Sequence, residues 1–322
     1  MTIKATGKAL VTGGAGFIGS HLCDSLVKHD WQITILDNFS AGSRDNLRHL
    51  LTQRPEEVKL LEGDCTNPAH VKKALSGVET VFHFAANPEV RLELNDPQTC
   101  FKQNVHATHV LLQQIKDNRK IRTIIFLSTS SVYGEAETMP TPESYGPWKP
   151  ISPYGASKLA SEALISAYAY TYNKKAITLR LANIIGPRSQ HGVIHDFVQK
   201  LRKNPKQLEI LGDGTQNKSY LYIDDCVKAI ETAYKTAQNQ VEIYNVGSED
   251  QTTVIKIANI VAEEMSLENV KFKCTGGVDG GRGWKGDVKN MLLDTAKLKS
   301  KGWKPRHNSA EAIRKTVTYY LR

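Results

Sequence analysis

The sequence lacks any apolar run that approaches the ~18 residues a membrane-spanning helix needs. It also lacks internal repeats and low-complexity linkers, so we expect most of the chain to fold. The first residues, MTIKATGKALVTGG, hold an apolar run too short for a signal peptide and lead directly into a glycine loop. We therefore expect the start to form the first strand of the fold, and we expect a cytoplasmic protein with no membrane partner.

Cysteine is scarce, with five residues, an odd number, and no pair spaced as CxxC. This pattern argues against a disulfide framework and against a structural zinc site. His191 and His195 have the i, i+4 spacing of half a metal site, but no third ligand is near, so we expect no metal and interpret them as surface or substrate-lid residues. We expect all five cysteines to be packing residues: Cys23, Cys65, Cys100, Cys226 and Cys274.

Acidic residues are outnumbered, since 42 Lys and Arg against 33 Asp and Glu leave a formal net charge of +9. The positive residues are scattered, and the densest runs, 118–122 and 297–301, lie near expected helix ends. A solvated surface explains such runs better than a nucleic-acid patch does. We therefore expect no nucleic-acid partner, and the positive excess suits an acidic small-molecule substrate.

Short β-rich runs alternate with helical patterns through the first half of the chain. A helix is expected over 17–29, and another after Asn67 and Pro68, which supply an N-cap and a first-turn proline, with Gly77 closing it. Such alternation is typical of βαβ units with right-handed crossovers. The sequence therefore predicts an α/β fold with a doubly wound parallel sheet of the Rossmann type. Its expected strands are 9–12, 33–36, 58–61, 80–84, 123–127 and 176–181.

The alternation loosens after residue 182, where glycine clusters separate shorter elements. We expect a dinucleotide-binding domain over 1–182 and a smaller, irregular α/β substrate-binding region over 183–322. The helix expected over 223–237 and the strand expected over 243–246 look regular, so 222–248 is assigned back to the first domain. The acidic pair Asp224-Asp225 at the start of that helix is interpreted as capping and as a complement to the helix dipole.

The strand over 9–12 runs into a loop with glycines at its first, fourth and seventh positions, Gly13, Gly16 and Gly19. Such glycines allow a tight turn and a close approach of the backbone to a pyrophosphate at a helix N-terminus. Asp37 ends the next strand, at the spacing expected for an acid that binds ribose hydroxyls. Its charge would repel a 2′-phosphate, so NAD is favoured over NADP, although Arg44 nearby leaves NADP open.

Tyr154 and Lys158 are four residues apart, on one face of a helix that Pro153 would open. An unperturbed tyrosine titrates near ~10, and a neighbouring cation favours its phenolate, which makes it a usable base. The pair follows the segment 128–134 (STSSVYG) at the carboxyl end of the fifth expected strand. Ligands of doubly wound sheets bind at that edge, so we expect a catalytic site there.

These motifs resemble the extended short-chain dehydrogenase/reductase family, and within it the nucleotide-sugar epimerases, most closely the archaeal-type UDP-glucose 4-epimerases. The resemblance covers nearly the whole chain. Besides the glycines and Asp37, it is carried by Gly63-Asp64, the segment 83–91 (HFAANPEVR), Asn104, Thr129, Tyr154, Lys158, and the segments 180–183 (RLAN) and 212–216 (GDGTQ).

The resemblance implies NAD as cofactor, a UDP-sugar as substrate, and 4-epimerisation by reversible hydride transfer through a 4-keto sugar. Tyr154 would be the acid/base, Lys158 would hold the nicotinamide ribose and lower the tyrosine pKa, and Thr129 would bond the oxidised oxygen. The implied cofactor-binding residues are Gly13, Gly16, Phe17, Ile18, Gly19, Asp37, Asn38, Ser40, Asp64, Cys65, Ala85, Ala86, Asn104, Tyr154 and Lys158. The implied substrate-binding residues are Asn87, Thr129, Tyr154, Asn183, Val193, Lys218, Tyr220, Arg282, Asp287 and Met291.

The chain departs from the family pattern where two arginines usually clamp the diphosphate. Lys218-Ser219 stands in place of Arg-Asp, and Trp284 in place of the second arginine. Lysine supplies the charge without a bidentate fork, and Arg282, two positions away, could substitute. Met291 matches the position that gates the sugar's 2-substituent, and a flexible thioether there neither excludes nor admits an N-acetyl group.

Alternatives remain in substrate, reaction and class. The sugar could be a UDP-N-acetylhexosamine or UDP-glucuronate. Dehydratases and decarboxylases of the family carry acids after the catalytic threonine, where this chain has Ser130-Ser131, which favours epimerisation. A non-catalytic NAD-sensing or RNA-binding relative would be expected to lack the catalytic residues. In this family the helices equivalent to 99–115 and 154–172 pair with a second subunit, so we expect a homodimer, although both could be simple core stripes.

Overall fold

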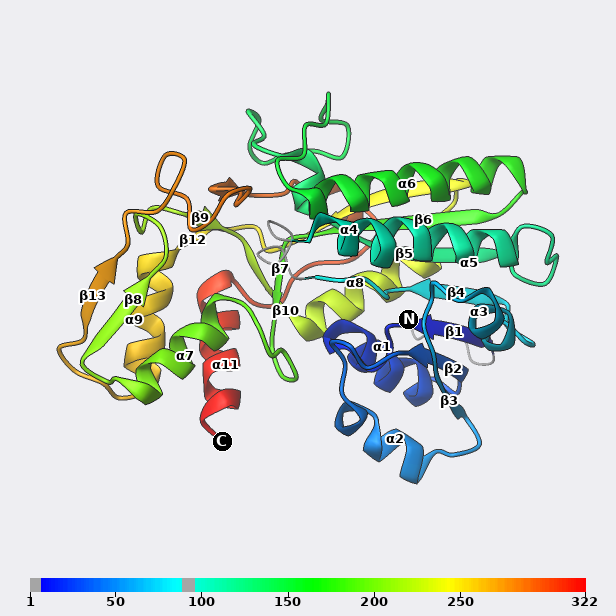
Figure 1. Ribbon diagram of the computed structural model, residues 1–322, viewed down its shortest axis with the longest axis horizontal. Coiled ribbons are helices and arrows are strands. Elements are labelled where there is room, and N and C mark those ends of the chain that lie inside the picture. Colours follow the sequence, from blue (N-terminus) through cyan, green and yellow to red (C-terminus); the bar gives the residue numbers. More distant parts are fainter. Residues whose placement is uncertain (1–6, 89–95) are drawn as a thin grey trace. The chain divides into compact units, whose positions relative to one another are not determined.

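The computed structural model describes residues 7–88 and 96–322, drawn in colour in Figure 1. Glu89, Val90 and Arg91, which belong to one of the family motifs, lie outside the described residues. The chain divides into two compact units by its internal contacts. The first comprises 1–129, 153–180 and 230–244, and the second comprises 130–152, 181–229 and 245–322.

A seven-stranded sheet forms the centre of the first unit. Its strand order is β11-β6-β5-β4-β1-β2-β3, and the pairings from β3 through β2, β1 and β4 to β5 are parallel. This is the order of a Rossmann sheet, whose direction of winding reverses between β1 and β4. The strands are β1 (Lys8–Thr12), β2 (Gln32–Asp37), β3 (Val58–Glu62), β4 (Thr80–His83), β5 (Thr123–Thr129), β6 (Lys175–Leu181) and β11 (Val241–Val246).

The strands form where the sequence places short β-branched runs without interruption. Every residue of β4 is buried, and β1 exposes only Lys8, as expected for parallel strands covered on both faces. The predicted fold class is confirmed, and each of the six strands expected in the first domain is present within two residues of its expected bounds. The strand expected over 243–246 is also present, as the end of β11.

Helices cover both faces of this sheet. α3 packs against α5, α5 against α6, and α6 against β5, while α1 packs on β1 and β2 and is joined to α8 by a hydrogen bond from Ser25 to Glu231. The main apolar cluster joins Leu10, Leu111, Phe126 and Ile165 from strands and helices of one face. These helices are α1 (Phe17–Lys28), α2 (Arg48–Gln53), α3 (Pro68–Ala74), α4 (Pro97–Cys100), α5 (Ala107–Ile115), α6 (Pro153–Thr171) and α8 (Ile223–Thr236).

Local signals set the ends of these helices. The Asn67 side chain accepts hydrogen bonds from the N–H groups of Ala69 and His70 at the start of α3, and Gly77 beyond its end has a φ of +76°. The run expected to be one helix over 99–115 is α4 and α5 joined by a π-helical segment, Phe101–His106. Within the described residues, no helix is both long enough and apolar enough to cross a membrane.

The second unit is built from short strand pairs and a group of helices. α11 packs against α7 and α9, and α7 packs against α9. The sheets are β7 with β10, β12 with β9 and β14, and β8 with β13. The bounds are β7 (Asn183–Ile185), α7 (Val193–Lys203), β8 (Gln207–Ile210), β9 (Asn217–Lys218), β10 (Tyr220–Tyr222), β12 (Thr252–Thr253), α9 (Val254–Glu264), β13 (Lys271–Cys274), β14 (Asn290–Met291), α10 (Ala296–Lys299) and α11 (Ser309–Leu321).

The division of the chain differs from the expected one at its boundaries. Residues 130–152, expected in the first domain, belong to the second unit, and only 230–244 of the returning segment 222–248 belongs to the first. The connection from β5 to α6 explains the first difference. Gly134 lies against the backbone of Lys149, and Thr141 pairs with Leu293, so this segment forms its contacts within the second unit.

A buried ion pair links α6 to β6 inside the first unit. The Arg180 guanidinium donates to both carboxylate oxygens of Glu162, with Nη2 2.7 Å from Oε2. Arg180 is fully buried and Glu162 is 6% exposed. Removing one partner of such a pair leaves an uncompensated buried charge, which costs far more than the net worth of the pair.

Glu162→Met is therefore expected to lower the free energy of unfolding by ~3 to 5 kcal/mol. Urea unfolding measures this directly. The matched control is Glu57→Met, which removes the more exposed Arg54–Glu57 pair and should cost less than ~1 kcal/mol. The double variant Glu162→Met/Arg180→Met should recover most of the loss. A single-variant loss no larger than that of the control would contradict the account.

Candidate functional site

The glycine loop turns the chain from β1 into α1. Gly13 has a φ of +70°, and a Cβ there would lie 2.7 Å from the N atom of Ala85. A Cβ on Gly19 would lie 2.2 Å from the carbonyl oxygen of Gly13. Both positions therefore need glycine for the fold itself, because the turn packs against β4 and onto the first turn of α1.

Gly16 is different, because the fold alone does not require it. It is the N-cap residue of α1, its φ of −74° suits any residue, and a Cβ there would meet only the Gly13 oxygen, at 3.2 Å. The first N–H groups of α1, those of Phe17 and Ile18, have no intrahelical acceptor, and this end of the helix favours negative charge. The loop therefore leaves room beside unused donors, which suits a close-lying phosphate.

Asp37, the last residue of β2, is 7% exposed and ties the loop to the sheet. Its two carboxylate oxygens accept hydrogen bonds from the N–H groups of Ala15 and Phe39, both at 2.8 Å. Burial raises the pKa of Asp37, and these two hydrogen bonds act against that shift. Arg44, which left NADP open, is paired with Glu62 and lies over the Phe39 ring. Asp37 is thus the acid that borders the loop.

The residues predicted after β2 and β3 form one hydrogen-bonded group. Asn38 donates to Asp64, 3.1 Å away, and accepts from the N–H of Ser40. Burial opposes ionisation of Asp64, but hydrogen bonds from Thr66 and Asn38 together lower its pKa. Burial raises the pKa of Cys65 to about 12, so this residue stays a neutral thiol.

Asn104 connects the predicted cofactor residues with the predicted catalytic helix. It lies in the π-helical segment and is 2% exposed. Its Oδ1 accepts from the N–H of Asn87, and its Nδ2 donates to Ser157 Oγ, both at 2.8 Å. Ser157 in turn donates to the carbonyl oxygen of Tyr154. π-helical segments are frequent at functional sites, and this one aims Asn104 at the segment after β4 and at α6.

The three predicted catalytic residues all belong to the first unit. Thr129 ends β5, and α6, which packs against β5, carries Tyr154 in its first turn and Lys158 one turn later. Thr129 and Tyr154 are partly buried, and Lys158 is 3% exposed with its Nζ 4.2 Å from the centre of the Phe126 ring. Burial lowers the pKa of Lys158 to about 7, and Glu162 opposes this shift.

In the second unit, Lys218 is paired with a buried acid. Its Nζ lies 2.5 Å from Asp287 Oδ1 and 5.6 Å from the centre of the Trp284 ring. Asn183 donates to the carbonyl oxygen of Ser219, next to Lys218. Tyr220 is buried, which raises its pKa, as does the charge of Asp287. Met291 pairs with Lys218 across β14 and β9, and Val193 is the first residue of α7.

Arg282, the candidate substitute for the missing arginines, is engaged by its own unit. Its Nε donates to the carbonyl oxygen of Asp287 at 3.0 Å, its Nη2 to Glu135 at 2.8 Å, and its Nη1 to the carbonyl oxygen of Asp279. The guanidinium fork is thus used to hold the glycine-rich loop together. Lys218 and Arg282 each have a carboxylate partner, which balances the positive charge of the side chain.

One interpretation made from local pattern is incomplete and another is wrong. Asp225 lies with Asp224 in the first turn of α8, as expected for a complement to the helix dipole, but it is also 1% exposed and accepts hydrogen bonds from Arg306 and His307. The expectation that every cysteine packs in the interior is wrong for Cys274, which is exposed, while the other four are buried. The hydrogen-bond partners of Asp225 lie more than 80 residues further along the chain, so the local sequence pattern could not predict them.

The two histidines that have the spacing of half a metal site make other contacts. The His195 ring packs edge-on against Tyr320, with ring centres 5.6 Å apart. The His191 carbonyl oxygen accepts from Ser189. Over residues 7–88 and 96–322, no group of three or more His, Cys, Asp or Glu side chains is placed to hold a metal ion.

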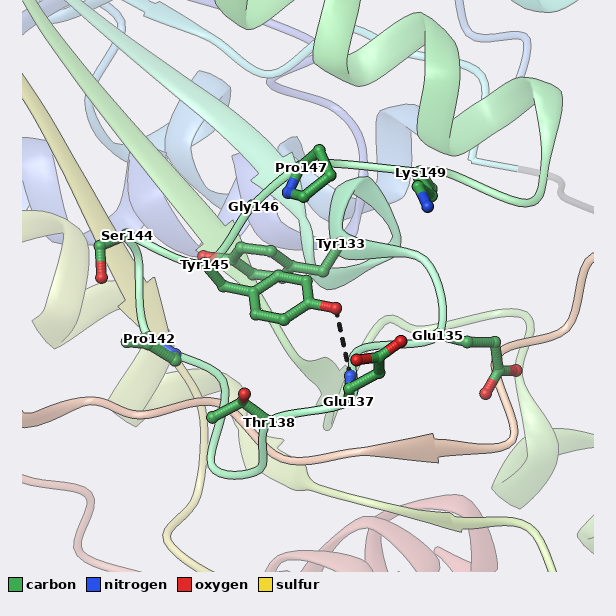
Figure 2. A pocket seen from close by; sticks show the side chains of 10 residues that line it. All are labelled: Tyr133, Glu135, Glu137, Thr138, Pro142, Ser144, Tyr145, Gly146, Pro147 and Lys149. Carbon is green, nitrogen blue, oxygen red and sulfur yellow. Dashed lines mark hydrogen bonds between the residues drawn. The ribbon is translucent and has the colours of Figure 1, made fainter.

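A pocket of about 450 Å³ lies in the second unit, in the connection between β5 and α6 (Figure 2). The rings of Tyr133 and Tyr145 meet edge to face, and the Tyr145 hydroxyl accepts a hydrogen bond from the N–H of Glu137 at 3.2 Å. None of the residues predicted for the site is among the ten that line this pocket. The volume of this pocket is therefore no evidence that a reaction takes place in it.

The structure adds residues to the site that the sequence did not single out. Thr12 at the end of β1, His83 at the end of β4 and Thr108 on α5 form a buried hydrogen-bonded row that leads to Asn104. His83 is within a family motif, yet no role was assigned to it. The signal present in the sequence was a histidine that ends an otherwise apolar strand, which predicts a polar partner at the same sheet edge.

Comparison with known proteins supports one family. A model of the NAD dependent epimerase/dehydratase family matches residues 9–247. A protein of Methanocaldococcus jannaschii, provisionally named a UDP-glucose 4-epimerase, is 33% identical over 316 residues, 96% of this chain and 97% of that protein.

Solved structures give the same picture over the whole chain. The crystal structure of a UDP-galactose 4-epimerase is 40% identical, with a TM-score of 0.85 and 98% of each chain covered. A UDP-glucuronic acid 4-epimerase from Bacillus cereus, solved with UDP-glucuronic acid and NAD, is 28% identical, with a TM-score of 0.86, covering 98% of this chain and 99% of that one. The names share a 4-epimerase reaction and differ in the sugar.

The lowered pKa of Lys158 predicts a measurable cost in stability. A lysine whose pKa is lower in the folded chain destabilises it at every pH below the unfolded value of ~10.4, and the cost grows as pH falls toward about 7. Lys158→Met should therefore raise the free energy of unfolding of the cofactor-free protein at pH 7. The gain should shrink by up to ~1.4 kcal/mol per pH unit as pH rises toward 10.

Urea unfolding at a series of pH values measures this gain. Lys73→Met, on the solvent side of α3, is the control and should show no gain that varies with pH. A Lys158→Met variant that is less stable than the parent at pH 7, or whose gain is the same at every pH, would show that burial does not lower the lysine pKa.

Proposed function

The chain belongs to the NAD-dependent epimerase/dehydratase family, and from that membership we propose that it interconverts UDP-glucose and UDP-galactose by 4-epimerisation through a 4-keto intermediate. The observation that carries the proposal lies at the carboxyl edge of the sheet. Thr129 ends β5 there, and the adjoining helix α6 presents Tyr154 and, one turn later, the buried Lys158. A hydroxyl, a phenol and an amine in this order suit proton transfer to and from a sugar hydroxyl.

The cofactor is NAD, and the residues of this chain fit it. The open side of Gly16 and the unused N–H groups of α1 suit a pyrophosphate, and Asp37 has acceptor capacity left for ribose hydroxyls. The Arg44 side chain is already paired with Glu62, so its charge is not left over to bind a 2′-phosphate. This arrangement supports NAD over NADP.

Tyr154 would take the proton of the sugar's 4-hydroxyl and later return it. When bound beside the sugar, NAD would supply a reversible hydride acceptor for the hydrogen of carbon 4. Thr129 would hold the oxygen of carbon 4, and the ammonium form of Lys158 would stabilise the Tyr154 phenolate. A phenolate nearby favours the ammonium in return, so the two groups titrate as a coupled pair.

The residues after Thr129 favour epimerisation over dehydration. A dehydratase must also remove the proton at carbon 5, which needs a further acid or base near the sugar. This chain has Ser130 and Ser131 at those positions, and serine hydroxyls are poor proton acceptors near neutral pH. The 4-keto sugar is then left with one route, return of the hydride.

For the nucleotide and sugar we propose the second unit, with Asn183, Val193, Lys218, Tyr220, Arg282, Asp287 and Met291 as contacts. Because Lys218 and Arg282 have carboxylate partners, their net attraction for a diphosphate is weaker than that of two unpaired arginines. Trp284 offers a ring face beside Lys218 in place of a guanidinium. Met291 is 7% exposed, and its flexible side chain keeps N-acetyl sugars as a second substrate class.

We also propose a homodimer. The helical run Pro97–Ile115 and α6 pack on each other, and each exposes a large aromatic residue, Phe101 at 61% and Tyr170 at 63%. Exposed apolar groups on two adjacent helices suit a helix-to-helix interface with a second copy. The cytoplasmic location stays an expectation from the sequence.

Turnover of UDP-glucose in heavy water tests the function. The expected product is UDP-galactose without deuterium at carbon 5 and without a 4-keto-6-deoxy sugar, as read by proton NMR. Deuterium at carbon 5 or a deoxy product would mean that another residue supplies a second acid/base, and the proposal would be withdrawn.

The matched variant is Tyr154→Phe, which keeps the ring and removes the proton-carrying hydroxyl. Its turnover should fall by ~10² to 10⁴, while its affinity for UDP-glucose, measured by calorimetry, stays close to that of the parent. Near-parental turnover would remove Tyr154 from the mechanism. UDP-N-acetylglucosamine and UDP-glucuronate in parallel reactions decide which sugar is used.

A further inference from the structure

His83 is a buried histidine at the centre of the sheet edge that carries the catalytic residues. It ends β4, is 1% exposed, and stacks on Phe126 of β5 with ring centres 5.8 Å apart. Its Nδ1 lies 2.8 Å from the Thr12 hydroxyl of β1, and its Nε2 lies 2.9 Å from the Thr108 hydroxyl of α5. Both ring nitrogens therefore have a partner, one from the sheet and one from a helix.

The neighbouring groups favour one placement of each proton in this row. Thr12 Oγ1 accepts from the N–H groups of Phe84 and Ala85, and for its own proton His83 Nδ1, at 2.8 Å, is a better acceptor than the neighbouring Cys65 thiol. Thr108 Oγ1 donates to the carbonyl oxygen of Asn104 at 2.6 Å and has Ser161 Oγ, at 3.4 Å, as a second acceptor, which leaves it to accept from His83 Nε2. In this arrangement the row runs in one direction, with a neutral His83 that carries its proton on Nε2.

The row ends at Asn104, where it meets the catalytic helix. The Asn104 carbonyl oxygen accepts from Thr108 and from Ser161, and its side chain donates to Ser157. Ser157 and Ser161 flank Lys158 on α6, and Ser157 donates to the carbonyl of Tyr154. Through Asn104, His83 thus braces the turn of α6 that presents the tyrosine and the lysine.

The nearby positive charge of Lys158 also favours the neutral form of His83. The elements packed around it bring Thr12 from β1, Phe126 from β5, Thr108 from α5 and, as the charged group, Lys158 from α6. Burial first, and the Lys158 charge second, lower the pKa of His83 to about 3. An imidazolium there would add a second cation beside a lysine whose ammonium is already disfavoured by burial.

We propose that His83, locked as the neutral Nε2–H tautomer between Thr12 and Thr108, is a positioning residue that holds Asn104 and the Tyr154–Lys158 turn of α6 in register for proton transfer. It does not touch the reacting atoms. Its effect on turnover rests on the proposed function, whereas its tautomer and its charge state do not.

The first test reads the tautomer in the parent protein. Long-range ¹⁵N–¹H NMR of the histidine-labelled protein, with the His83 signals identified by their loss in His83→Gln, should show a protonated Nε2 and a bare Nδ1. These signals should stay the same from pH 5.5 to 9. A proton on Nδ1, or a titration within that range, would overturn the proposal.

The second test separates positioning from general stability. His83→Phe keeps a ring against Phe126 and removes both hydrogen bonds, so we expect kcat to fall by about 10- to 100-fold, with KM for the sugar changed by less than about threefold. The acid limb of its kcat profile should move to higher pH, because a displaced lysine stabilises the phenolate less.

His83→Gln serves as the conservative variant, since its amide can accept from Thr12 and donate to Thr108, and it should recover most of kcat. The control is His49→Phe, at the half-exposed His49–Asp24 contact, which should leave kcat and its pH profile unchanged. If His83→Phe is merely less stable and keeps the parental kcat and pH profile, His83 is a structural residue only and the proposal is wrong.

The two tests also separate this proposal from the proposed function. A parent protein that epimerises no UDP-sugar would contradict the function while the NMR result still decides the state of His83. A titrating or Nδ1-protonated His83 in an active enzyme would contradict the positioning role alone.

Discussion

Lys158 is an amine held where water is almost excluded, and the surrounding structure is arranged around that constraint. The side chain is 3% exposed and lies over the Phe126 ring, and the nearby carboxylate of Glu162 is already bound to Arg180. A buried ammonium needs such neighbours, because burial without a partner favours its neutral form. His83, which is close enough to feel the lysine charge, is kept neutral by burial, so it adds no second cation beside Lys158.

The same sheet edge carries both the residues proposed to bind the cofactor and those proposed to be catalytic. β1, β2, β4 and β5 all end there, which brings the glycine turn, Asp37, His83 and Thr129 to one side of the sheet although their positions in the chain are far apart. These residues come together because the strands are parallel, so every strand has its carboxyl end at the same edge of the sheet. The hydrogen-bonded row from Thr12 to Asn104 then joins the glycine-loop strand to the helix that carries Tyr154.

Local signals were sufficient for most of the fold and for part of the site. The strands, α1, α3 and α6 follow from β-branched runs, a first-turn proline and an asparagine cap, and the positions of Gly13, Tyr154 and Lys158 follow from spacing. Pairings between distant segments did not follow. Arg282 is held by Glu135, Asp225 by Arg306 and His83 by Thr12, each across 70 to 150 residues, and the periodicity of a strand or helix carries no information on such partners. The two units defined by internal contacts differ from the expected division at residues 130–152, where Thr141 pairs with Leu293 far along the chain.

The central claim is that this sheet edge removes hydrogen from carbon 4 of a UDP-hexose and returns it to the same carbon, with no net oxidation. UDP-glucose carrying deuterium at carbon 4 tests this most directly. The account predicts UDP-galactose that keeps its deuterium at carbon 4, because a hydrogen transferred as hydride does not exchange with water. UDP-galactose with hydrogen from solvent at that carbon would contradict it, since the hydrogen would then have left the site before its return.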